Sequence, residues 1–192
     1  MVSGYGAPVS ASALSSADIG SPGLAGSWNH DAGANTHTLR AAGYDIWYDS
    51  DEFHFVHQEV NGDVELVVRV DSLTYTDYWS KAGLMLRAGT AATDPHASVF
   101  VTPGAGVRMQ WRESGGGQSS STGELGGAAP QFLKLVRSGN TFTAHRSDDG
   151  SNWSQFHSVV LNFPQTLRAG LALTAHNAGA HATAVFSNFD IT

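Results

Sequence analysis

Short runs that alternate between apolar and polar residues fill most of this chain, and turns rich in glycine separate them. The clearest runs are DVELVVRVDSL (63–73), QFLKLVRS (131–138) and ATAVFSNFDI (182–191). A period of two residues is typical of a β-strand that buries one face. Similar runs lie at 52–60, 81–88, 96–103, 106–114, 140–147, 156–163 and 168–176. About ten such strands without helical crossovers predict an all-β fold, an antiparallel two-sheet β-sandwich.

The length of the chain indicates one domain. It has 192 residues, of which 41% are apolar, and this suits one full core better than two. Residues 1–16 are rich in Gly, Ala, Ser and Pro, so we expect a flexible lead-in or linker remnant there and a single domain over 17–192. The first residues lack the charged start and apolar block of a secretory signal.

Charge and composition exclude several classes of partner. Lys and Arg together number 10, against 17 for Asp and Glu, which gives a formal charge of −7. Nucleic acid is therefore not an expected partner, because phosphate binding needs clustered positive charge. No apolar run approaches the roughly 20 residues that span a bilayer, so we expect no membrane insertion. The absence of cysteine excludes disulfides and zinc-thiolate sites.

The turn DDGSNW after the strand at 140–147 has the pattern of an Asp box. Asp148, Gly150 and Trp153 match that motif, whereas Arg146 stands where it has Ser or Thr. We expect the Asp148 carboxylate to accept hydrogen bonds from turn amides and Trp153 to pack beneath the turn. The turn is therefore predicted to serve folding, and a binding surface has to lie elsewhere.

Several blocks of this sequence carry a resemblance to a known family. The blocks are GYDIWYDSDEFHFVHQEVNGDVELVVRVDSL, WSKAGLMLR, HASVFVTPGAGVRMQWRES, LVRSGNTFTAHRSDDGSNW and GLALTAHN. Over about 17–192 the chain resembles the concanavalin A-like jelly-roll modules attached to many bacterial extracellular proteins, including glycoside hydrolases. Relatives of these modules include a domain-of-unknown-function family named after a yeast enolase regulator. The resemblance implies a jelly roll located outside the cell within a larger protein, but folds of this kind serve binders, enzymes and spacers alike.

Three predicted strands share a face that is unusually polar. Alternation places on one side the residues Lys81, Arg87, His96, Gln110 and Arg112. If these strands are neighbours, their donors face the hydroxyls of a sugar while Trp79 or Trp47 stacks on its ring. Two arginines and a lysine favour acidic glycans, since guanidinium groups bind carboxylates in bidentate fashion. An ordinary solvated face of a sandwich has the same polarity, and both interpretations stay open.

We expect the five tryptophans to differ in their exposure to solvent. Trp28, Trp47 and Trp79 lie near predicted loops, which favours exposure, whereas Trp111 and Trp153 are expected in the core or under a turn.

A structural calcium ion is the metal that this architecture favours. Carboxylates near the chain ends often hold such an ion, and Asp18 and Asp190 are the expected ligands, with Asp94 as a further candidate. His54 and His57 lie three apart in a predicted strand, so they point to opposite faces and do not share a transition metal.

Catalysis has weaker support than binding. Glucanases of this fold carry a Glu-x-Asp-x-Glu strand with two close carboxylates, and this sequence contains no such pattern. His96, Lys81 and Arg87 are residue types that a polysaccharide lyase uses, so the enzyme alternative stays open. We expect a non-catalytic accessory module that binds a polysaccharide or other glycan. The alternatives are a glucanase-type or lyase-type enzyme and a structural spacer or adhesion module.

Overall fold

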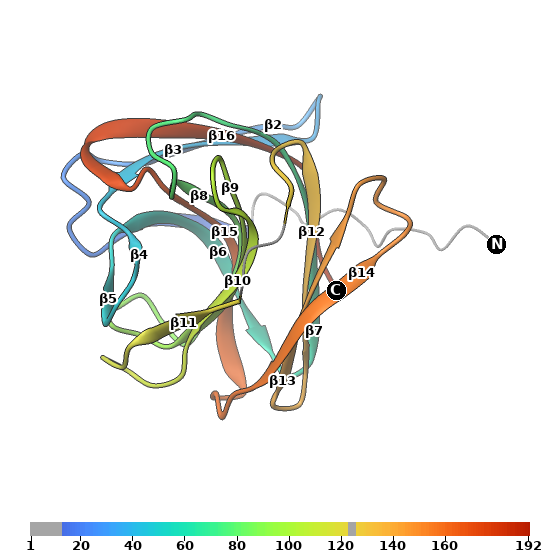
Figure 1. The fold of residues 1–192 in the computed structure, drawn as a ribbon. Coiled ribbons are helices and arrows are strands. Elements are labelled where there is room, and N and C mark those ends of the chain that lie inside the picture. The colour runs from blue at the N-terminus through green and yellow to red at the C-terminus, as the bar shows by residue number, and fades with distance from the viewer. Residues whose placement is uncertain (1–12, 123–125) are drawn as a thin grey trace.

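Two antiparallel sheets of seven strands each pack face to face in the computed structural model, which describes residues 13–122 and 126–192 (Figure 1). Sheet A runs in the order β1 (Ser15–Ile19), β6 (Phe53–Asn61), β15 (Thr166–Thr174), β8 (Lys81–Arg87), β9 (His96–Thr102), β10 (Gly106–Arg112) and β11 (Ser119–Ser121). Sheet B runs in the order β14 (Ser154–Val160), β13 (Thr141–Ser147), β12 (Gln131–Ser138), β7 (Val64–Leu73), β16 (Asn177–Ile191), β3 (Thr36–Gly43) and β2 (Ser27–Asp31). The predicted all-β two-sheet sandwich is confirmed.

The sequence pattern located the strands from residue 52 onward except β11, and it missed the strands before residue 52. Strand β1 begins at Ser15, inside the predicted lead-in, and residues 1–12 of that lead-in lie outside the described residues. Strands β2 and β3 were also missed, as was the short pair formed by β4 (Ile46–Trp47) and β5 (Ser50–Asp51). No helix in the described part of the chain is long and apolar enough to cross a membrane.

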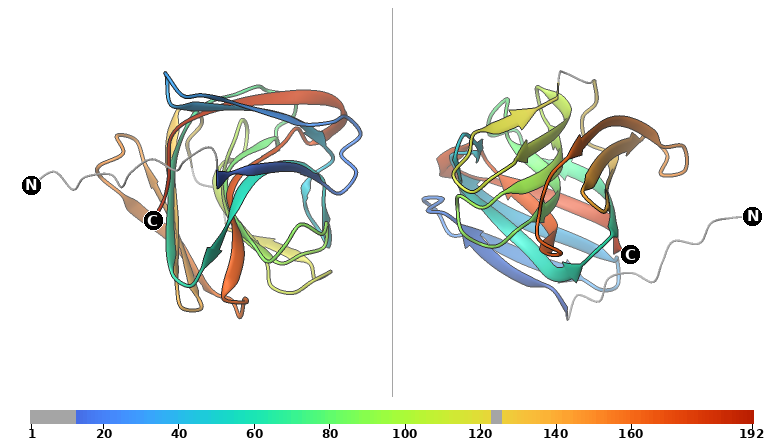
Figure 2. Two further views of the ribbon diagram at one scale, coloured as in Figure 1. Left: turned by 180° about the vertical axis from the view of Figure 1, so that it is seen from behind. Right: turned by 90° about the horizontal axis from the view of Figure 1, so that it is seen from below.

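The main core lies between the two sheets. It contains Leu84, Leu86 and Val99 from sheet A together with Leu66 and Leu133 from sheet B, all fully buried. In β12 the burial alternates residue by residue, as expected for a strand with one face toward solvent. Both views in Figure 2 show the two sheets curving around this interior.

A second apolar cluster covers the outer face of sheet A, the face turned away from sheet B. Its members include Phe53, Phe55, Met85 and Phe100, and Ile46 from the segment 44–52 packs onto them. We call this segment the covering segment; it carries β4 and β5, which lie beside sheet A in Figure 1. Strands β8 and β9 are consequently buried on both faces, and the outer face of sheet A is not an ordinary solvated face.

The turn after β13 serves folding as predicted, but a different carboxylate organises it. Asp149, not Asp148, accepts hydrogen bonds from the amides of Ser151 (2.8 Å) and Asn152 (2.7 Å). These hydrogen bonds hold the pKa of Asp149 well below its usual range. Trp153 is half-buried, and the Lys134 ammonium lies 4.5 Å from its ring centre.

Gly170 marks a point where sheet A tolerates no side chain. It pairs with His57 in β6 and Met85 in β8, and a Cβ atom added to it would lie 1.9 Å from the carbonyl oxygen of Val56. We expect Gly170→Ala to lower the free energy of unfolding by about 1–3 kcal/mol, because backbone atoms have to move. Urea unfolding measures the change. The control is Gly126→Ala, since a Cβ there meets nothing within 4 Å; equal stability of both variants would contradict the prediction.

Candidate ligand-binding pocket

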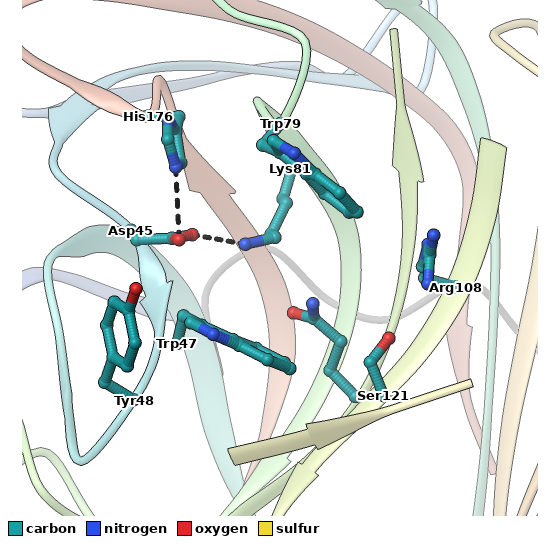
Figure 3. Close-up of a pocket in the computed structure, with 9 residues that line it drawn as sticks. Asp45, Trp47, Tyr48, Trp79, Lys81, Arg108, Ser121 and His176 are labelled. Atoms are coloured by element: carbon teal, nitrogen blue, oxygen red, sulfur yellow. Dashed lines mark hydrogen bonds and ion pairs between the residues drawn. The ribbon is translucent and has the colours of Figure 1, made fainter. Parts of the chain in front are cut away.

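A cavity of about 330 Å³ opens beside the outer face of sheet A (Figure 3). It is lined by Asp45, Trp47, Tyr48, Trp79, Lys81, Arg108, Gln110, Ser121 and His176. Strands β8, β10 and β11 supply part of this lining, and the covering segment supplies another part. The pocket therefore joins residues that are far apart in the sequence.

Lys81 lies at the base of the pocket between two tryptophans. Its Nζ atom is 6.0 Å from the ring centre of Trp47 and 5.9 Å from that of Trp79. The ammonium group forms an ion pair with Asp45 and donates to the carbonyl oxygen of Ile46 at 3.3 Å. Burial lowers the pKa of Lys81, while the charge of Asp45 opposes this effect. The lysine thus holds the covering segment against the sheet with its charge facing two aromatic rings.

His176 connects the two segments that carry these tryptophans. Its Nε2 atom lies 3.2 Å from Oδ2 of Asp45, and its Nδ1 atom lies 3.2 Å from Oδ1 of Asp77. Asp45 precedes Trp47 in the covering segment, and the amide of Trp79 donates to Asp77 at 2.8 Å. Asp45, His176 and Asp77 therefore link the two segments that carry the indole rings.

The remaining wall of the pocket offers polar groups to a ligand. Gln110 is buried, and its Oε1 atom has no hydrogen-bond partner among the described residues. The guanidinium carbon of Arg108 lies 4.9 Å from the ring centre of Trp79, and its Nη1 atom donates to the carbonyl oxygen of Thr122. A buried amide oxygen without a partner is costly, but this atom has almost no exposed surface and is not an open acceptor of the pocket.

The polar residues predicted from alternation do share the outer face of sheet A, but they divide into two groups. Lys81 and Gln110 line the pocket, as does Trp79. Arg87, His96 and Arg112 are completely buried and line no part of it. The expected ligand surface is thus narrower than the set of residues on that face.

Asp51 of the covering segment binds both buried arginines. Nη1 of Arg87 donates to its Oδ2 atom at 2.6 Å, and Nη2 of Arg112 donates to its Oδ1 atom at 2.6 Å. Burial raises the pKa of Asp51, but the hydrogen bond from Arg112 and the neighbouring positive charges outweigh it, so the pKa is lowered. Arg112 also donates to the carbonyl oxygens of Trp47 (3.0 Å) and Tyr48 (3.2 Å). Arg112 therefore positions the backbone of one pocket wall, although neither buried arginine lines the pocket itself.

The expected calcium ligands lie in different sheets. Asp18 in β1 contacts Nδ1 of His54 at 2.7 Å, while Asp190 belongs to β16 of sheet B. Asp94, the further candidate, accepts a hydrogen bond from the amide of Ala91 at 2.8 Å. Within 13–122 and 126–192, no three acidic, histidine or cysteine side chains are grouped so that they could hold a metal ion. The calcium site stays a prediction without an observed set of ligands.

Solved structures show which known proteins share this fold. No protein-family model matches the sequence, and no curated protein matches it. A functionally unknown protein from Saccharomyces cerevisiae is 16% identical with a TM-score of 0.72, and the match covers 95% of this chain and 97% of that one. Carbohydrate-binding module CBM66 from Bacillus subtilis is 15% identical with a TM-score of 0.56, over 92% and 94% of the two chains. A GH43 protein from Bacillus licheniformis is 15% identical with a TM-score of 0.61, over 85% of this chain and 37% of that one.

These identities are low, so the likenesses show the fold alone. Together with the sheet order they confirm the predicted jelly roll.

Loss of one buried arginine is expected to destabilise the fold strongly. Arg112→Ala leaves Asp51 and Arg87 with an incomplete set of buried partners, and breaking such a cluster costs about 3–5 kcal/mol. Urea unfolding measures this loss. Arg168→Ala is the control, because Arg168 is 38% exposed in its ion pair with Glu59 and such pairs contribute at most about 1 kcal/mol. Similar losses for the two variants would show that the cluster around Asp51 is not an anchor.

Stability is expected to fall as the pH drops below about 6.5. Burial lowers the pKa of His96 to about 3 and that of His37 to about 4. Both histidines are neutral in the folded chain and bind protons more readily when it unfolds, so their contribution is complete above pH 6.5 and is lost on acidification. Each histidine contributes a slope of at most about 1.4 kcal/mol per pH unit. Denaturation of the wild type and of His96→Asn between pH 7 and 5 tests this, and identical slopes would contradict it.

Proposed function

We propose that this chain is a non-catalytic accessory module of an extracellular protein and that it binds a glycan in the pocket between Trp47 and Trp79. The observation that carries this proposal is the pair of indole rings on either side of the Lys81 ammonium, above a polar base. Pockets that combine aromatic walls with a few fixed polar groups are typical of small-molecule binding sites.

The chemistry of the pocket matches a sugar ring. A pyranose or furanose has C–H faces that pack on aromatic rings and hydroxyls that donate and accept hydrogen bonds. Trp47 and Trp79 supply the rings, while the carboxylate of Asp45 supplies an acceptor and Gln110 adds a polar wall. The cavity of about 330 Å³ lies at the lower end of the ~300–1,000 Å³ range of ligand pockets, so it holds only a small part of a glycan.

Charge recognition has less support than hydroxyl recognition. The sequence favoured acidic glycans because of Arg87, Arg112 and Lys81. Both arginines are buried against Asp51, and Lys81 is paired with Asp45. We therefore expect neutral glycans to bind at least as well as acidic ones, since a cation that already has a carboxylate partner gains less from a second one.

The fold supports an accessory role. CBM66 from Bacillus subtilis is a carbohydrate-binding module with the same fold, and the GH43 protein carries a similar domain as 37% of its chain. A jelly roll of this kind thus occurs as one part of a larger protein. The extracellular location is proposed from the sequence resemblance.

Binding to a panel of soluble polysaccharides tests the proposal. The panel contains xylan, glucan, mannan and fructan as neutral members and pectate and alginate as acidic members. Calorimetry measures affinity, and assays for reducing ends and unsaturated products detect turnover. Binding without products supports the proposal. Turnover would support the enzyme alternative, a polysaccharide-active enzyme of the glucanase or lyase type. No binding to any member would favour the spacer or adhesion alternative.

Replacement of one pocket tryptophan is expected to remove most of the affinity. Trp79→Ala deletes an aromatic wall, and we expect a loss of about tenfold or more in affinity for the best-binding polysaccharide. The matched control is Trp153→Ala, because Trp153 also lies beside a lysine but belongs to the turn after β13. Calorimetry compares the two variants after thermal unfolding confirms that both are folded. Unchanged affinity of Trp79→Ala, or an equal loss in both, would place the binding surface elsewhere.

A further inference from the structure

Exposed tyrosines gather around the pocket. Among the described residues, the large hydrophobic side chains that remain exposed are Leu24, Tyr44, Tyr48, Tyr75, Tyr78 and Val160. All four tyrosines fall in two short segments, 44–48 and 75–78, which contain Trp47 and directly precede Trp79. Single apolar residues on a surface need no explanation, whereas a gathered set marks a contact surface.

Three of these rings adjoin the pocket directly. Tyr48 lines it. Tyr44 stacks on His176 with ring centres 5.7 Å apart, and Tyr78 lies edge-on to Trp79 with ring centres 5.6 Å apart. The aromatic surface of the pocket therefore continues outward along both segments.

Tyr48 is held in a conformation that bulky residues avoid. Its φ angle is 44°, which lies in the left-handed region where side chains other than glycine are unfavourable. Its carbonyl oxygen accepts hydrogen bonds from the amide (2.9 Å) and the hydroxyl (2.8 Å) of Ser119 as well as from Arg112. Such strain persists where the surroundings impose it, and it is concentrated at ligand sites. The hydrogen bonds from Ser119 and Arg112 thus hold Tyr48, which is 58% exposed, in position at the pocket wall.

Tyr78 is fixed by a glycine on the turn between β9 and β10. The amide of Gly104 donates to the carbonyl oxygen of Tyr78 at 3.1 Å. A Cβ atom on Gly104 would lie 2.0 Å from Cδ2 of Tyr78, so only glycine lets the turn approach the ring this closely. A ring that is already held in place loses little conformational entropy when a ligand packs on it.

We infer that Tyr44, Tyr48 and Tyr78 form stacking positions beyond the pocket, so that the ligand is a glycan chain of several units and not a single sugar. This inference rests on the proposed glycan binding. The pocket holds one part of the chain, and neighbouring units pack on the tyrosine rings, whose hydroxyls also bond to sugar hydroxyls.

Affinity as a function of chain length tests the inference. Fragments of increasing length are prepared by partial hydrolysis of each polysaccharide of the panel, namely xylan, glucan, mannan, fructan, pectate and alginate. For the wild type, we expect the longest fragments to bind at least about tenfold more tightly than the shortest ones that bind. Tyr44→Ala and Tyr78→Ala are each expected to reduce this ratio about threefold to tenfold.

Tyr75→Ala is the matched control. Tyr75 is 67% exposed and lies in the same segment as Tyr78, but it does not line the pocket and does not adjoin Trp79 in the sequence, so the ratio should stay unchanged. Thermal unfolding checks that all variants are folded. If short and long fragments bind equally to the wild type, or the tyrosine variants keep its ratio, the inference is wrong and the pocket proposal stands. If no polysaccharide or fragment binds the wild type, the proposed function itself fails.

Discussion

The binding of Asp51 by two buried arginines is the interaction on which the rest of the site depends. A carboxylate without exposed surface is unstable unless ion pairs and hydrogen bonds compensate its lost hydration, and Arg87 and Arg112 supply both. Several of their other N–H groups donate to loop carbonyl oxygens, such as that of Ala91 at 2.6 Å from Arg87, whereas Nε of Arg87 has no partner among the described residues. Because Asp51 belongs to the covering segment and the arginines belong to sheet A, satisfying these charges fixes the segment on the sheet. The second apolar cluster and the pocket both follow from that placement.

Several strands could be predicted from the sequence because they bury only one face, and β12 and β13 show this alternation most clearly. Strands β2 and β3 were missed although β3 also alternates in burial: its sequence, THTLRAAG, has small and polar residues where the pattern requires large apolar ones. Alternation also placed Lys81, Arg87, His96, Gln110 and Arg112 on one face correctly. What it did not reveal is that another segment covers this face.

The sequence did contain one indication that another segment packs on the outer face of sheet A. Met85 and Phe100 lie among the polar residues on the outer face of sheet A, and both are completely buried in the second cluster. Apolar side chains within a polar face indicate that something packs on it. The pocket residues Asp45 and His176 gave no comparable signal, since each lies outside a regular strand and its role arises from partners that are distant in sequence. Contacts of this kind follow from the tertiary fold and have no period to detect.

The covering segment is attached to the sheet through its backbone, through the apolar side chain of Ile46 and through two carboxylates, Asp45 and Asp51. Arg112 contacts the carbonyl oxygens of Trp47 and Tyr48, which every amino acid possesses, and leaves their side chains to the pocket. The backbone of Trp47 and Tyr48 is therefore held by contacts that do not depend on which side chains these positions carry. Exchange of side chains at these two positions can alter the chemistry of the pocket surface while the anchor stays intact, so the same backbone frame can carry different pocket walls.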